Sequence, residues 1–167
     1  MKRMRKANID AYLTVIVRDK NGKVVYRRRY KSRSFVEGFL NALQSSFSSS
    51  TAANGSIGSP NLVVGSGTTP PQITNTGLTN QIGNGTGPGQ LQYGTDSFTS
   101  PIINVNTNTG SFTWSKTFNN GSGGNVTVSE VGAYFGTTFV LHDLLPSSIT
   151  LLPNQVLTAV YTITIST

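Results

Sequence analysis

The sequence contains no cysteine and a single histidine, and only six of its 167 residues are acidic. Without cysteine, neither a disulfide framework nor a thiolate metal site can form. No apolar run approaches the roughly 20 residues that a membrane-spanning helix needs. The basic N-terminus is not followed by the apolar stretch and cleavage site of a signal peptide. We therefore expect no membrane span, no exported precursor, and no cofactor or metal.

Charge is concentrated at one end of the chain. Positions 1–33 hold twelve of the 13 Lys and Arg residues and only two acidic residues, a net charge of +10. The remaining positions hold Lys116 against four acidic residues, a net charge of −3. A cationic head on a nearly neutral body predicts a partner for the head, either nucleic acid or a neighbouring subunit.

A β-hairpin is predicted over residues 9–31. Its strands show period-two alternation, and Asn21-Gly22 is a typical hairpin-turn dipeptide. The return strand interleaves Tyr26 and Tyr30 with cations, an array that can neutralise phosphates and stack on bases. The candidate contacts to nucleic acid or to a neighbouring subunit are the basic residues Lys2, Arg3, Arg5, Lys6, Arg27, Arg28, Arg29, Lys31 and Arg33.

The rest of the chain predicts a mainly β fold with one helix. Ser34 and Glu37 form a capping box that opens a helix over residues 34–47, which carries a helical stripe of apolar residues. Short strands separated by turn signals follow, and the alternating run at 156–165 predicts a central strand. We predict a flexible basic arm at 1–7 and a single jelly-roll-like β-sandwich at 8–167, which includes the hairpin and the short helix.

Candidate catalytic chemistry centres on the lone histidine. His142 adjoins Asp143, but a metal site would need further ligands. We interpret His142 as a polar residue at a strand end near a turn. Glu130 and Asp143 could in principle pair as acid and base, and the alternative is a structural role such as turn hydrogen bonding or pairing with Lys116. The glycine-rich runs do not match a phosphate-binding loop. We predict no catalytic, cofactor-binding or metal-binding residue, and no enzyme.

Several segments resemble a group of phage and virus structural proteins. These are LVVGSGTTPPQITNTGL (62–78), VSEVGAYF (128–135), the closing unit from Phe139 to Ile165, and KSRSFVEGFLNAL (31–43). His142 stands where the pattern of this group has arginine, so no role is carried over to that position. The resemblance implies a non-enzymatic virion component: a capsid, decoration, turret or tail protein.

The predicted function is that of a self-assembling virion subunit, of the shell or decoration type. It would be assembled in the host cytoplasm, with copies of itself, other virion proteins and nucleic acid as candidate partners. The alternatives are a tail or fibre subunit, and a cellular extracellular filament joined by strand donation from the N-terminus. A sugar-binding sandwich enzyme would use Trp114, Phe112 and Tyr93 for stacking, although core packing explains these aromatics equally well.

Overall fold

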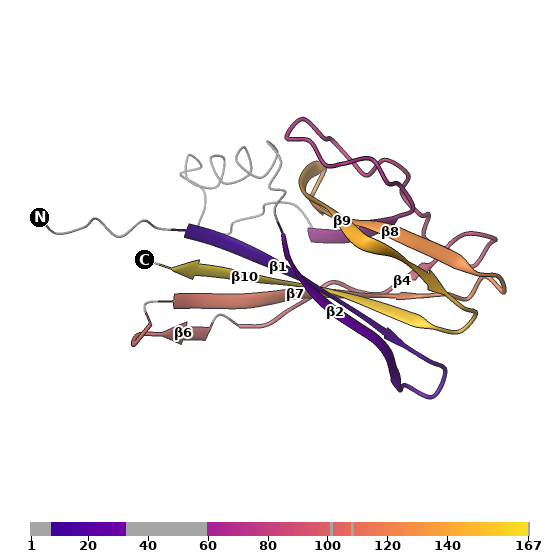
Figure 1. Ribbon diagram of the computed structural model, residues 1–167, viewed down its shortest axis with the longest axis horizontal. Coiled ribbons are helices and arrows are strands. Elements are labelled where there is room, and N and C mark those ends of the chain that lie inside the picture. Colours follow the sequence, from indigo (N-terminus) through magenta and orange to yellow (C-terminus); the bar gives the residue numbers. More distant parts are fainter. Residues whose placement is uncertain (1–7, 33–59, 101, 108, 167) are drawn as a thin grey trace, which may run out of the picture.

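The computed structural model describes residues 8–32, 60–100, 102–107 and 109–166. The predicted arm at 1–7 and the predicted helix at 34–47 lie outside these residues. The described part is mainly β, with ten strands in two antiparallel sheets (Figure 1).

The larger sheet has seven strands, and the C-terminal strand lies in its middle. The order is β2-β1-β10-β7-β4, and the short strands β5 and β6 also pair with β7. The bounds of these strands are Asn8–Arg18 (β1), Val24–Ser32 (β2), Gln92–Tyr93 (β4), Ser97–Phe98 (β5), Ile102–Asn104 (β6), Thr109–Asn119 (β7) and Val156–Ser166 (β10). The prediction of a central final strand is confirmed, because β10 pairs along its whole length with β1 and with β7.

The smaller sheet has three strands in the order β3-β8-β9. Their bounds are Pro60–Gly65 (β3), Val126–Phe135 (β8) and Thr138–Leu151 (β9). Figure 1 shows β8 and β9 lying over one half of the larger sheet, while β6 extends toward the end where β1 begins and β10 ends. Within the described residues, the chain passes between the two sheets at the β3–β4, β7–β8 and β9–β10 connections.

The N-terminal hairpin is confirmed, and its register fixes which side chains face inward. Leu13, opposite Tyr30, and Val15, opposite Arg28, face the core, whereas Arg29 lies opposite Thr14 on the outward face. In the turn, Gly22 has a φ of 79° and donates its N–H to the carbonyl of Asp19. The sequence favours positive φ at both turn residues, but only Gly22 adopts it.

One hydrophobic core lies between the sheets. Alternate residues of β1, β7 and β10 face inward toward alternate residues of β3, β8 and β9, as the period of two requires. The largest fully buried members are Trp114, Tyr161, Phe118, Leu13, Leu62, Leu91, Leu151 and Leu157. Trp114 stacks between Phe98 and Phe135, at ring-centroid distances of 5.4 and 5.2 Å. The ring of Trp114 is therefore part of the hydrophobic core and offers no stacking surface to a sugar.

Candidate functional site

A cluster of hydrogen bonds centres on the carboxylate of Glu130, on β8. Its side chain is fully buried on the face of the smaller sheet that points away from the core, under the loop at 66–80. Its Oε1 accepts the backbone N–H groups of Gly67 (3.0 Å) and Asn80 (2.8 Å), and its Oε2 accepts that of Thr79 (3.1 Å). One carboxylate therefore ties both ends of the loop to β8.

His142 on β9 completes this cluster. Its Nε2 lies 2.9 Å from Oε2 of Glu130, and its Nδ1 lies 2.9 Å from Oδ1 of Asn75. That Oδ1 also accepts the backbone N–H of Gln72 at 2.7 Å, which identifies it as the acceptor. Nδ1 therefore donates to Asn75, and Nε2 faces the carboxylate of Glu130. We call Glu130, His142 and Asn75 the loop latch.

The interpretation of His142 as a strand-end residue is wrong, because it lies within β9 and is 1% exposed. The pairing of Glu130 or Asp143 with Lys116 is also wrong, since Lys116 pairs with Asp96 at 2.7 Å. An acid–base pair of Glu130 and Asp143 is excluded by the register. His142 lies opposite Gly132 and Asp143 opposite Val131, which places the two carboxylates on opposite faces of the sheet.

The glycines of the motifs 62–78 and 128–135 make room for the latch. A Cβ on Gly67 would lie 2.5 Å from Oε1 of Glu130 and 2.6 Å from Cβ of Thr79. A Cβ on Gly132 would lie 2.7 Å from the ring of Phe139. Both glycines are thus required by close packing between the loop, β8 and β9 rather than by a phosphate ligand.

We expect Gly67→Ala to lower the free energy of unfolding by about 1–3 kcal/mol, the usual cost of overpacking. The added methyl group would push Glu130 away from the loop amides. Chemical denaturation measures the effect, and Gly124→Ala is the matched control because a Cβ there meets nothing within 4 Å. Equal stability of the two variants would contradict this account of the latch.

Asp143 lies on the core-facing side of β9 and joins the two sheets. Its Oδ2 accepts hydrogen bonds from Ser32 Oγ (2.8 Å) on β2 and from Tyr161 Oη (2.9 Å) on β10.

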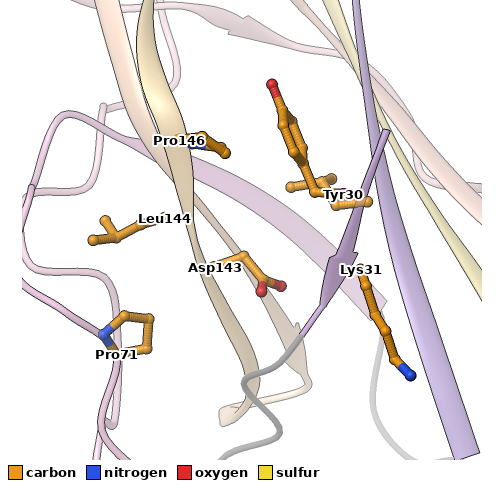
Figure 2. A pocket seen from close by; sticks show the side chains of 7 residues that line it. Tyr30, Lys31, Pro71, Asp143, Leu144 and Pro146 are labelled. Atoms are coloured by element: carbon orange, nitrogen blue, oxygen red, sulfur yellow. The ribbon is translucent and has the colours of Figure 1, made fainter. Parts of the chain in front are cut away.

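A cleft of about 360 Å³ lies beside Asp143, in which Asp143 faces the strand carrying Tyr30 and Lys31 (Figure 2). The other lining residues are Leu13, Pro71, Leu144 and Pro146. The one carboxylate of this cleft already accepts two hydrogen bonds from the neighbouring strands.

Alkaline pH is expected to destabilise the fold through Tyr161. Burial raises the pKa of Tyr161 well above its ordinary value of 10.0, and the Asp143 carboxylate raises it further. The folded state then retains a proton that the unfolded state loses above pH 10, so stability is full below that pH and falls as pH rises. Because one pKa unit corresponds to about 1.4 kcal/mol, Tyr161→Phe should reduce the slope of stability against pH by up to that amount per pH unit. Denaturation at several alkaline pH values tests this, and an unchanged slope would contradict it.

A second buried cluster joins the sheets at Asp96. Its Oδ1 accepts the backbone N–H of Leu62 (2.9 Å) on β3 and Nε1–H of Trp114 (2.8 Å) on β7. Its Oδ2 accepts from Nζ of Lys116, which also donates to Oδ1 of Asn61 at 2.6 Å. Lys116 is 6% and Asp96 12% exposed, so this is a largely buried ion pair.

The predicted contact residues divide between described and undescribed parts of the chain. Arg27, Arg28, Arg29 and Lys31 are exposed on β2, which is an edge strand. Lys31 pairs with Asp10 at 2.8 Å, and the guanidinium of Arg29 lies 4.3 Å above the ring centre of Tyr12. Lys2, Arg3, Arg5, Lys6 and Arg33 lie outside the described residues.

Sequence reasoning missed the partners that complete these clusters. No pairing could be predicted for Asn75, Asp96, Ser32 or Tyr161, because the partner of each is distant in the sequence. The one available signal was the position of Tyr161 on the apolar side of its strand, where a hydroxyl needs a partner. No group of three or more His, Cys, Asp or Glu side chains among the described residues could hold a metal ion. Within the same residues, no helix has the length and apolarity to cross a bilayer.

Comparison of the chain with protein-family models, with curated proteins and with solved structures finds no match.

Proposed function

We propose that this chain is a self-assembling structural subunit of a virion, of the shell or decoration type, with its basic N-terminal region contacting nucleic acid or a neighbouring subunit. As part of this proposal, the two sheets form a sandwich of jelly-roll type, which is supported by the β7–β8 and β9–β10 connections between them. The segments that resemble phage and virus structural proteins also support it.

The observation that carries the proposal is the uncharged stretch that β10 and β7 form on the outward face of the larger sheet. An antiparallel sheet that faces water is ordinarily polar on its outer side, and the cores of protein interfaces are depleted in charge. The register places only uncharged residues on this face of β10 and β7: Val156, Thr158, Val160, Thr162 and Thr164, with Ser111, Thr113, Ser115, Thr117 and Asn119. Such a face suits burial against another subunit.

Exposed apolar residues at the β6 end of the same sheet support assembly as well. The side chains of Ile102, Ile103 and Val105 are 69%, 70% and 78% exposed. Apolar residues grouped in this way mark interaction sites more often than isolated ones do. The three acidic side chains that the structure describes in the body, in contrast, are engaged in the loop latch and in the clusters around Asp143 and Asp96, where they stabilise the fold.

The experiment is to measure assembly by analytical ultracentrifugation and electron microscopy as protein concentration increases. We expect large regular assemblies that Thr158→Glu disrupts by placing a charge at the centre of the uncharged face. Thr127→Glu is the matched control, because Thr127 is exposed on β8 of the smaller sheet. A monomer at all concentrations, or equal assembly by both variants, would count against the proposal.

A tail or fibre subunit is the second candidate, and the exposed β6 end favours it because docking there needs no closed shell. The electron micrographs distinguish the two, since a shell subunit forms closed particles or sheets and a fibre subunit forms rods. Filament growth by N-terminal strand donation is less well supported, because β1 already fills its place between β2 and β10 of its own chain.

A further inference from the structure

The cations of the β1–β2 hairpin exceed the acidic groups within their reach. Residues 8–32 carry seven Lys and Arg side chains and two acidic ones, Asp10 and Asp19. Asp10 pairs with Lys31, and the carboxylate of Asp19 accepts backbone N–H groups within the turn. Among the described residues, no carboxylate lies within ion-pair distance of Arg18, Arg27, Arg28 or Arg29.

A second copy of the described body could not supply the missing negative charge. Glu130 is fully buried in the loop latch, Asp96 is bound to Lys116, and Asp143 is 8% exposed and accepts two hydrogen bonds. Exposing any of these carboxylates would break contacts that hold the fold. Within the described residues, a second copy therefore offers the hairpin no available carboxylate, which favours a partner that brings its own negative charge.

The arrangement of the cations fits a regularly charged polymer. Arg27, Arg29 and Lys31 alternate along the outward face of β2, opposite Ile16, Thr14 and Tyr12. Residues two apart on a strand are separated by about 6.7 Å, so the charges form an evenly spaced row at the sheet edge. Arg18 lies on the same face of the sheet, on the neighbouring strand, where it is opposite Val156 of β10.

Aromatic and guanidinium groups add planar surfaces to this row. The guanidinium of Arg29 lies over the half-exposed ring of Tyr12, at 4.3 Å from the ring centre. Guanidinium groups bind phosphate oxygens in a bidentate manner, and rings beside them stack on bases. A folded acidic protein would offer carboxylates at irregular spacing and no bases to stack.

From this geometry we infer that the outward face of the hairpin, formed by Arg18, Arg27, Arg29 and Tyr12, binds the phosphate backbone of a nucleic acid rather than a neighbouring subunit. The inference rests on the proposed function for its biological setting, in which the nucleic acid is the genome of the virion. Contact through phosphates implies binding without sequence preference and with strong salt dependence.

The test measures binding of a fluorescently labelled single-stranded oligodeoxynucleotide to the full chain by anisotropy across a series of salt concentrations. We expect R18Q/R27Q/R29Q to reduce the slope of log affinity against log salt by roughly 2, because each lost phosphate contact accounts for about 0.7. The matched control, K20Q/K23Q/R28Q, removes three cations of the same hairpin that lie off the proposed face. Its slope should fall by less than about 0.7. R18K/R27K/R29K, which keeps the charge, should retain most of the slope.

Three outcomes would overturn the inference: no binding by the unaltered chain at low salt, equal losses in the two triple variants, or equal competition by poly-glutamate. The last would identify an acidic protein as the partner. Thermal unfolding of each variant verifies that it is folded. Assembly is measured separately on the same samples. Intact assembly without oligonucleotide binding refutes this inference alone, whereas oligonucleotide binding without assembly refutes the proposed function alone.

Discussion

Replacing Glu130 with alanine is expected to lower the free energy of unfolding by about 3–5 kcal/mol, because several hydrogen-bond donors of this cluster would lose their acceptor and each buried donor left unpaired costs about 1–3 kcal/mol. The change would leave Nε2 of His142 without its carboxylate partner. It would also leave the backbone N–H groups of Gly67, Thr79 and Asn80 without an acceptor. Chemical denaturation measures the loss. Hydrogen exchange should show loss of protection at these three amides before global unfolding, because they are the attachment points of the 66–80 loop.

Glu130→Gln separates the contribution of charge from that of shape. The amide oxygen can still accept from Gly67 and Asn80, so the loss should be smaller than that in the alanine variant. The double variant E130A/H142A removes the unpaired imidazole as well, and we expect a coupling energy of about 0.5–3 kcal/mol between the two positions. A loss below about 1 kcal/mol in Glu130→Ala would show that water replaces the carboxylate and that the latch does not hold the loop.

The strands could be predicted because their signals are local. The alternation in residues 9–17 and 156–165 requires one face to be buried, and the structure buries one side of each of these strands. The alternation in residues 23–31 also indicated a strand, but none of these side chains is fully buried, because β2 lies at the edge of the sheet. Gly22 likewise marked the turn of the hairpin, because the turn needs a residue that tolerates positive φ. The central position of β10 followed from its length and its freedom from Gly and Pro.

The polar clusters could not be predicted because their partners come from distant parts of the chain. Ser32 and Asp143 are separated by 111 positions, and Glu130 and Gly67 by 63. Nothing near His142 shows that β8 brings a carboxylate beside it and that a loop covers both. The resemblance to structural proteins singled out the segments that contain the latch residues. The reason for the glycines in these segments is visible only in the structure, where a Cβ at Gly67 or Gly132 would lie too close to neighbouring atoms.

Removing Asp96 should weaken the junction of the two sheets by about 3 kcal/mol. In Asp96→Ala the ammonium group of Lys116 stays buried and retains only Asn61 and the face of Tyr93, whose ring centre lies 5.4 Å away. The backbone N–H of Leu62 and the indole N–H of Trp114 also lose their acceptor, one from each sheet. Chemical denaturation measures the loss, and Asp19→Ala, in the exposed hairpin turn, should cost less than about 1 kcal/mol as the control.

The source of the destabilisation in Asp96→Ala can be isolated by removing the cation as well. Asp96→Asn keeps an oxygen for Leu62 and Trp114 but leaves Lys116 without a counter-charge, so it should still be clearly destabilised. D96N/K116M replaces the ammonium group with an apolar side chain of similar length. We expect it to recover most of the loss, because a buried ion pair can often be exchanged for uncharged groups at little cost while a lone buried charge cannot be tolerated. If D96N/K116M is as unstable as Asp96→Ala, the unpaired charge of Lys116 is not what destabilises the single variants. The cluster would then contribute to stability through the geometry of its hydrogen bonds.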